Sequence, residues 1–179
     1  MTNKLFFDTD CISAFLWVNN QSLLAQLYPG RIVIPNQVYN ELSFPNIPHL
    51  KARIDSLIES KDASIQSIEV GSRMYSLYLK LTTNPDSNHR IIGPGEAAGI
   101  VMAKEYNGIL ASNNLKDISQ YVDEFGIKQI TTGDIIYEAY DKQLISKEQA
   151  NQLWSEMINK KRKLGYSSFD EYLNSNKQK

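Results

Sequence analysis

The stretch LFFDTDCISAF, which spans Leu5–Phe15, decides the fold of this chain. Its first three residues are apolar, Asp8 and Asp10 interrupt the apolar run, and a second apolar stretch begins at Cys11. The short first run is typical of a strand buried on both faces, and the longer second run predicts a half-buried helix. The two aspartates therefore stand in a strand-to-helix turn, where open α/β sheets usually bind their ligands. The alternative interpretation makes Asp10 the N-cap of the helix and Asp8 a solvated turn residue.

The rest of the chain alternates between short apolar runs and amphipathic segments. Strands are predicted at Arg31–Ile34, Ile109–Ala111 and Ile127–Ile130, with a weaker edge strand at Ser64–Val70. The segments between them carry apolar residues at helical spacing. This alternation predicts an α/β fold with a central, mostly parallel sheet of four to five strands and helices on both faces.

The segment after residue 145 has a different character. It begins with the Ser-x-x-Gln pattern of a capping box at Ser146, and we predict one domain at 1–145 with a helical extension of the same domain at 146–179. The extension contains the basic run KKRK at 160–163. We interpret this run as a solvated helix end that the helix dipole favours, and the alternative is a patch that contacts phosphate groups. Residues 82–90 are polar, contain an Asn-Pro-Asp turn signal and are predicted to form a loop.

Composition excludes several classes of function. The net charge of −1 provides no overall basic field of the kind that attracts nucleic acid. A single cysteine excludes an intramolecular disulfide and every multi-cysteine zinc site, and it favours a reducing, cytoplasmic setting. No stretch approaches the roughly 20 apolar residues that span a bilayer, and the N-terminus lacks the pattern of a signal peptide. The two histidines, His49 and His89, lie far apart in the sequence, so catalysis is expected to depend on carboxylates.

Four acids occupy comparable positions in the predicted elements. Asp8 follows the first strand, Glu41 lies on the helix after the second, Glu96 is in the first turn of a helix rich in small residues, and Asp117 begins the helix after the Ile109–Ala111 strand. Helix capping and the helix dipole would each account for such an acid singly. If the strands are parallel, however, their carboxyl ends share one edge, and carboxylates gathered there repel one another unless a cation compensates.

A divalent cation is the expected compensation. Mg²⁺ and Mn²⁺ prefer oxygen ligands, and such an ion can activate water for attack on a phosphodiester. Ser112, Asn113 and Asn114 would add neutral hydrogen-bonding groups at the rim of this site.

Four segments together resemble the acidic motifs of PIN-domain nucleases. They are LFFDTDCISAF at 5–15, VIPNQVYNEL at 33–42, GPGEAAGIVMAKE at 93–105 and ILASNNLKDI at 109–118, and the resemblance covers about residues 4–140. It implies a three-layer α/β/α sandwich and a Mg²⁺- or Mn²⁺-dependent endoribonuclease. Within the family, the chain looks most like the VapC-like toxins of type II toxin–antitoxin pairs. That likeness implies an RNA substrate, a cognate antitoxin protein and a second copy of the chain as partners, and no membrane.

The resemblance also implies roles for the acids. Asp8, Glu41, Glu96 and Asp117 correspond to the four catalytic acids, and all of these except Glu41 are implied metal ligands. Thr9 and Asp10, with Ser112, Asn113 and Asn114, are expected to position substrate or support the ligands.

The chain departs from the family pattern at two places. Asp10 stands where the family often has Asn or Ser, and Asn113 and Asn114 stand where many members have acids. The second departure predicts weaker metal binding and motivates a different interpretation, a non-catalytic or weakly active PIN-like interaction or regulatory protein. A receiver-like domain is disfavoured because the sequence lacks the required pattern of an Asp followed by a Lys at strand ends.

Overall fold

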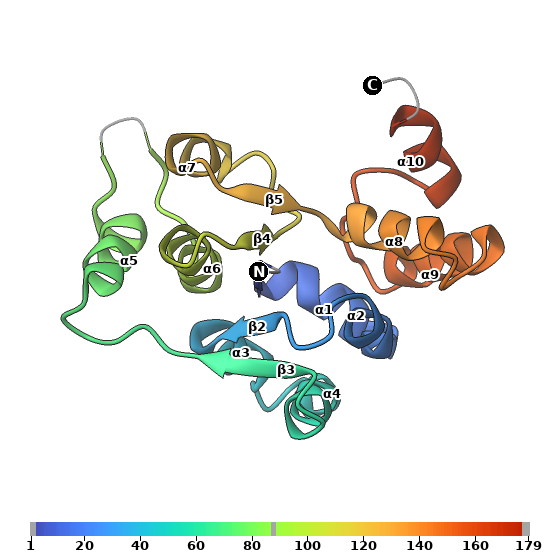
Figure 1. Ribbon diagram of the computed structural model, residues 1–179, viewed down its shortest axis with the longest axis horizontal. Helices are drawn as coiled ribbons and strands as arrows, with labels where there is room; N and C mark the ends of the chain where they lie inside the picture. Colours follow the sequence, from blue (N-terminus) through green and yellow to red (C-terminus); the bar gives the residue numbers. More distant parts are fainter. Residues whose placement is uncertain (1–2, 87–88, 177–179) are drawn as a thin grey trace.

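The central sheet confirms the predicted fold class. A computed structural model describes residues 3–86 and 89–176, and these form a five-stranded, all-parallel sheet in the order β3-β2-β1-β4-β5 (Figure 1). The strands are β1 (Leu5–Phe7), β2 (Ile32–Pro35), β3 (Ala63–Gln66), β4 (Ile109–Ala111) and β5 (Lys128–Ile130). The weak strand predicted at Ser64–Val70 is β3, which ends earlier and lies at one edge of the sheet.

Helices connect the strands and cover both faces of the sheet (Figure 1). They are α1 (Thr9–Trp17), α2 (Gln21–Leu27), α3 (Asn36–Leu42), α4 (Pro48–Glu59), α5 (Arg73–Thr83), α6 (Pro94–Glu105), α7 (Ser119–Phe125), α8 (Thr132–Asp141), α9 (Lys147–Asn159) and α10 (Phe169–Asn176). The parallel strands require such crossovers, because a tight turn cannot join them.

The central strand β1 divides the core into two parts. Leu5 and Phe7 pack in a cluster with buried side chains of α1, α2, α4, α8, α9 and α10, whereas Phe6 packs with those of α5, α6 and α7. Successive side chains of a strand point to opposite faces, so this division follows directly from the three consecutive apolar residues. All three are fully buried, which explains why the strand has no polar alternation.

The register of β1 places the ends of three strands together. Leu5 is opposite Ile32 of β2 and Ile109 of β4, and the amide of Asp8 donates to the carbonyl of Ala111 at 3.0 Å. The polar residues that follow these strands therefore share the carboxyl edge of the sheet, as the sequence predicts.

Helix α6 packs very closely on this sheet, in agreement with its small residues. A methyl group added at Gly99 would lie 2.9 Å from the side chain of Leu110. The same addition at Gly108, just before β4, would lie 2.5 Å from the ring of Phe6. This close approach brings the first turn of α6, which carries Glu96, to the carboxyl edge.

The C-terminal helices pack on the first of these two core clusters. Trp154 and Met157 of α9 and Phe169 of α10 are fully buried in the cluster that contains Leu5 and Phe7. The predicted loop at 82–90 and the predicted extension at 146–179 each include residues outside the described ranges, 87–88 and 177–179 respectively. No helix within the described part of the chain has the length and apolar character required to cross a bilayer.

We expect α9 to belong to the same cooperative unit as the sheet. Replacing Met157 with Ala should lower the free energy of unfolding by about 2–5 kcal/mol, because the change leaves a cavity in the core. Replacing its neighbour Ile158, which is 37% exposed, should change that free energy by only about 0.5 kcal/mol. Urea unfolding of both variants measures the difference. Equal effects, or a separate transition for α9, would contradict the shared core.

Candidate active site

Asp8 is a buried carboxylate at the junction of β1 and α1. Its backbone is extended, with φ −82° and ψ 168°, and its Oδ1 accepts a hydrogen bond from the amide of Cys11 at 2.7 Å. Asp8 is thus the N-cap of α1, and the interpretation that gave Asp10 this role is wrong, because the helix begins at Thr9 and Asp10 lies within its first turn. The side chain of Asp8 is 1% exposed, and its Oδ2 has no hydrogen-bond partner among the described residues.

The surroundings of Asp8 disfavour its negative charge. Burial raises the pKa of its carboxyl group to about 7, and the side chain of Ser112 and the amide of Cys11 offset only part of this effect. The nearby acids Asp10 and Glu96 raise the pKa further. A carboxylate in this state gains from any cation that reaches its free oxygen.

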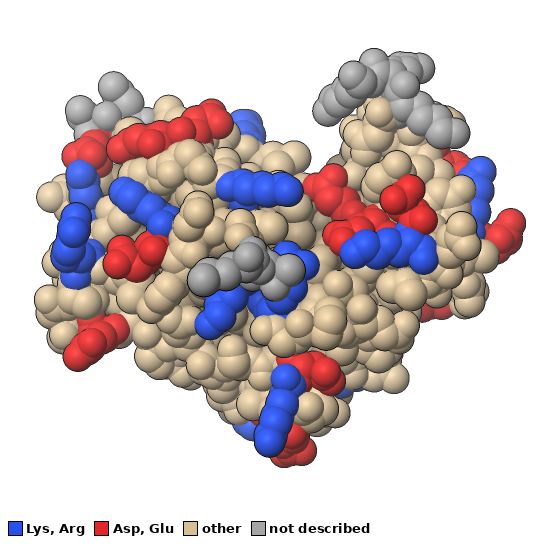
Figure 2. Space-filling view, in the orientation of Figure 1, with Lys and Arg blue, Asp and Glu red and all other residues tan. Residues whose placement is uncertain are grey.

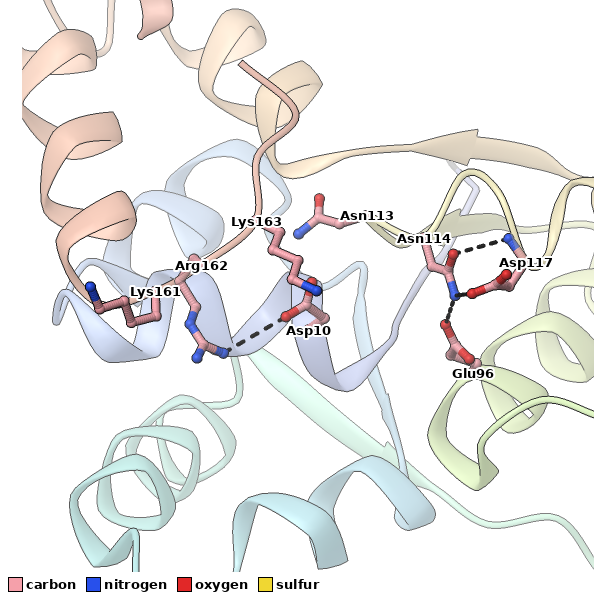
Figure 3. Close-up of a pocket in the computed structure, with 8 residues that line it drawn as sticks. All are labelled: Asp10, Glu96, Asn113, Asn114, Asp117, Lys161, Arg162 and Lys163. Atoms are coloured by element: carbon pink, nitrogen blue, oxygen red, sulfur yellow. Dashed lines mark hydrogen bonds and ion pairs between the residues drawn. The ribbon is translucent and has the colours of Figure 1, made fainter. Parts of the chain in front are cut away.

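Acids and bases line one cavity beside this junction. Its volume is about 460 Å³. Figure 3 shows the lining residues, which are Asp10, Glu96, Asn113, Asn114, Asp117, Lys161, Arg162 and Lys163. Five of the predicted site residues therefore line one cavity, namely Asp10, Glu96, Asn113, Asn114 and Asp117. Asp8 and Ser112 are predicted site residues that do not line it. Glu41 and Thr9 do not line the cavity.

Asn114 holds two of the predicted acids. Its Nδ2 donates to Glu96 Oε1 at 2.7 Å and to Asp117 Oδ2 at 3.3 Å, and its Oδ1 accepts from the amide of Asp117 at 3.1 Å (Figure 3). Asp117 lies in the turn before α7 and does not begin that helix, which starts at Ser119. Arg90 also forms an ion pair with Asp117 at 2.6 Å. The fourth acid is thus oriented by an amide and neutralised by a guanidinium group.

Glu41 connects three helices next to the cavity. Its Oε2 accepts a hydrogen bond from the hydroxyl group of Thr9 in α1, and its Oε1 accepts one from the amide of Gly95 in α6 at 3.2 Å. Gly95 makes this contact possible, because a methyl group there would lie 2.8 Å from Thr9 Oγ1 and 3.1 Å from both carboxylate oxygens of Glu41. Glu41 therefore uses both oxygens to position the helices that carry Asp8 and Glu96.

Ser112 and Asn113 follow the end of β4 in the site. Ser112 is fully buried, and its Oγ accepts from the amide of Asn114 at 3.2 Å. Asn113 Oδ1 accepts from the amide of Thr132 at 2.8 Å, which leaves its Nδ2 buried without a partner among the described residues. Both residues thus shape the loop that supports Asn114.

The acids fit a divalent ion only in part. No group of three or more Asp, Glu, His or Cys side chains within residues 3–86 and 89–176 is arranged to hold a metal ion. The donor set nevertheless consists of the oxygen atoms that Mg²⁺ and Mn²⁺ prefer, and the orphaned Oδ2 of Asp8 is a buried ligand atom without a partner. The kind of donor therefore suits such an ion, although no set of three acids within the described residues is assembled around one point.

The basic side of the cavity was not among the predicted site residues. Lys161, Arg162 and Lys163 belong to the run interpreted as a solvated helix end, yet they line the same cavity as the acids. Arg162 Nη1 lies 3.7 Å from Asp10 Oδ1. The run itself was visible in the sequence, but its position opposite Asp10 depends on how α9 packs on α1.

The burial of Asp8 predicts an unusual pH dependence of stability. A carboxyl group whose pKa is raised by folding stabilises the protein at low pH and loses that contribution as the pH rises through its folded pKa, here about 7. Asp8→Asn retains a capping oxygen but cannot ionise. Without divalent ions, its unfolding free energy relative to wild type should rise by roughly 4 kcal/mol between about pH 4 and pH 8.

Urea unfolding across this pH range, in the presence of a chelator, measures the effect. Asp123→Asn on the exposed side of α7 is the matched control and should show no such trend. A difference between Asp8→Asn and wild type that stays constant with pH would contradict the raised pKa.

Comparison with known proteins agrees with this geometry. A family model described as a PIN domain matches residues 4–178, and no curated protein matches the sequence. The match includes all four predicted acids and also the helices α9 and α10. Because the match spans nearly the whole chain, this protein belongs to the PIN-domain family.

Proposed function

We propose that this protein is a Mg²⁺- or Mn²⁺-dependent endoribonuclease that hydrolyses phosphodiester bonds. The observation that carries the proposal is the buried carboxylate of Asp8, whose Oδ2 has no hydrogen-bond partner among the described residues. It lies two residues before Asp10, which lines an acidic cavity at the carboxyl edge of the sheet. The PIN-domain family supplies a nuclease-type fold for this site. The repulsion that Asp10 and Glu96 exert on Asp8 supports a site that binds a cation.

Asp8 and Glu96 would hold the ion in this proposal, with Asp117 as the third acid. When bound, such an ion supplies a water molecule of lowered pKa and stabilises charge that develops on the phosphate. Asn114 keeps Glu96 and Asp117 oriented toward one another. Glu41 acts as a positioning residue, since Thr9 and Gly95 already use both of its oxygens.

We further propose that the protein is the toxin of a type II toxin–antitoxin pair and acts in the cytoplasm on RNA. The support is the resemblance of the four acidic motifs to VapC-like toxins. A cognate antitoxin and a second copy of the chain are the partners that this proposal implies.

Asp8→Asn should abolish cleavage while the fold remains intact. The variant removes the buried charge that the ion requires, so Mn²⁺-dependent cleavage of mixed RNAs should fall by about 100-fold or more. Expression of the wild type in a bacterial host should arrest growth, and expression of the variant should not. Asp123→Asn is the control with the same change of charge. Undiminished metal-dependent cleavage by Asp8→Asn would exclude this mechanism.

A second candidate is a non-catalytic interaction protein with the same fold. It is favoured by the ion pair between Arg90 and Asp117 and by the lack, within the described residues, of a ready three-acid metal group. Metal binding in solution distinguishes the two candidates.

We expect millimolar Mn²⁺ to stabilise the wild type. Binding to the folded state alone at about 10–100 times Kd adds about 1.4–2.7 kcal/mol to the free energy of unfolding. The melting temperature should therefore rise with Mn²⁺ for the wild type and stay constant for Asp8→Asn. The same lack of response in the wild type would favour the interaction protein.

A further inference from the structure

Three consecutive cations lie on the connector between α9 and α10. Lys161, Arg162 and Lys163 line the same cavity as Asp10, Glu96 and Asp117. In Figure 3, Arg162 points toward Asp10 and Lys163 extends over it, whereas the amino group of Lys161 points away from the acids. The cavity thus contains three acidic and three basic side chains. A simple explanation would be that the three basic side chains neutralise the three acidic ones. The individual contacts test this explanation.

Arg162 is held by the protein itself. Its Nη1 lies 3.7 Å from Asp10 and 3.5 Å from the hydroxyl oxygen of Ser13, and its guanidinium carbon lies 5.6 Å above the ring of Trp17. These contacts attach the connector to α1. The charge of Arg162 is therefore largely occupied in fixing the position of its two neighbours.

Lys161 and Lys163 have no comparable partner. Both are exposed, and neither forms an ion pair with any residue of the described ranges 3–86 and 89–176. Other lysines do form such pairs, as Lys51 does with Asp55 and Lys147 with Asp170. Neutralisation within the protein therefore does not explain these two lysines, because neither pairs with an acid of the described residues. Their charges are available to a negatively charged ligand.

The backbone gives no structural reason for a lysine at 161. The amides of Lys161 and Arg162 donate to the carbonyls of Ile158 and Met157, and Lys161 has a left-handed φ of 62°. This is the Schellman ending of a helix, in which the left-handed position favours glycine. A lysine there costs about 1 kcal/mol relative to glycine. Because Lys61 occupies the same kind of position after α4, the backbone conformation does not by itself indicate a ligand, and what matters is where the charge of Lys161 lies.

A second cavity continues from the first. It has a volume of about 380 Å³ and shares Asn113 and Lys163 with the acidic cavity. Its other lining residues include Tyr166, Gln129 and the acid Asp134. Lys163 is therefore the cation at which the two cavities meet, and it forms no ion pair with the described residues. Such a path suits an extended polyanion better than a single small anion.

We propose that Lys161 and Lys163 bind the phosphodiester backbone of a single-stranded RNA and guide the strand from the acidic cavity into the second cavity. The proposal rests on the proposed function, which supplies RNA as the substrate. Lysines that contact phosphate groups contribute affinity without base specificity, so the two residues position the substrate and are not catalytic residues.

Binding measured without metal tests this proposal separately from cleavage. The probe is a fluorescein-labelled single-stranded RNA of mixed sequence and about 12 nucleotides, titrated with protein in a chelator and followed by anisotropy. Lys161→Gly should weaken binding by about three- to tenfold at low salt and make the slope of log K against log salt about 0.7 less negative, the value for one lost phosphate contact.

Lys61→Gly is a matched control for this variant. Lys61 has a φ of 64° in the same Schellman arrangement after α4, because its amide donates to Ile58 and that of Asp62 to Leu57. Both variants remove one positive charge and relieve the same backbone conformation, so both should fold. Lys61 precedes β3 and lies away from the carboxyl edge, so its replacement should leave RNA binding unchanged.

Lys163→Gln and Lys160→Gln form a second pair within one basic run. Lys163 lines both cavities, whereas Lys160 lines neither. Lys163→Gln should weaken RNA binding as Lys161→Gly does, and Lys160→Gln should not. The proposal would be overturned if Lys163→Gln and Lys160→Gln, or Lys161→Gly and Lys61→Gly, weakened RNA binding equally. It would also be overturned if the wild type did not bind the RNA measurably at low salt.

One further result has a defined meaning. Metal-free RNA binding that depends on Lys161 and Lys163, together with no cleavage in Mn²⁺, would support this proposal and overturn the proposed function.

Discussion

The architecture of the site depends on one buried carboxylate. Asp8 stands between the last residue of the central strand and the first residue of α1, and its side chain caps that helix. One oxygen serves the helix, and the other is left without a partner in a setting that raises the pKa of the group. A capping role alone would be met more cheaply by a neutral Asn or Ser. The electrostatic cost of an aspartate at this place is therefore an argument for a cation.

The neighbouring acids are arranged around Asp8 in two ways. Glu41 lies on one side, and its two carboxylate oxygens accept hydrogen bonds from Thr9 and Gly95, which holds α1, α3 and α6 together. Glu96 and Asp117 lie on the cavity side, where Asn114 bridges them. Of the four acids, Glu41 thus holds helices together, and Glu96 and Asp117 line the cavity. Asp8 lies at the neighbouring strand-to-helix junction. The C-terminal connector then closes the cavity with cations, so a chain of nearly zero net charge acquires a strongly polar cleft.

Much of the fold could be predicted from short sequence patterns. The apolar runs at Leu5–Phe7 and Ile109–Ala111 are strands with the predicted bounds, and the alternation of elements predicted a parallel sheet. Small residues in α6 indicated close packing, which the contacts of Gly99 show. The errors concern single positions, such as the cap at Asp10 and the helix start at Asp117. These depend on one residue of register at a helix end, which apolar periodicity does not resolve.

By itself, the sequence determined the parallel sheet, the edge at which the acids gather and the prominence of Asp8, because hydrophobic periodicity and strand-end residues are local properties of the chain. Only the tertiary structure decided which charges share a cavity. Glu41 is turned into a link between helices, Asp117 is paired with Arg90, and Lys161–Lys163 are brought opposite acids that precede them by more than forty residues in the sequence. The physical reason is that these contacts arise from the packing of α9 on the core and of α6 on the sheet, and such long-range packing depends on the shapes of side chains that are distant in sequence.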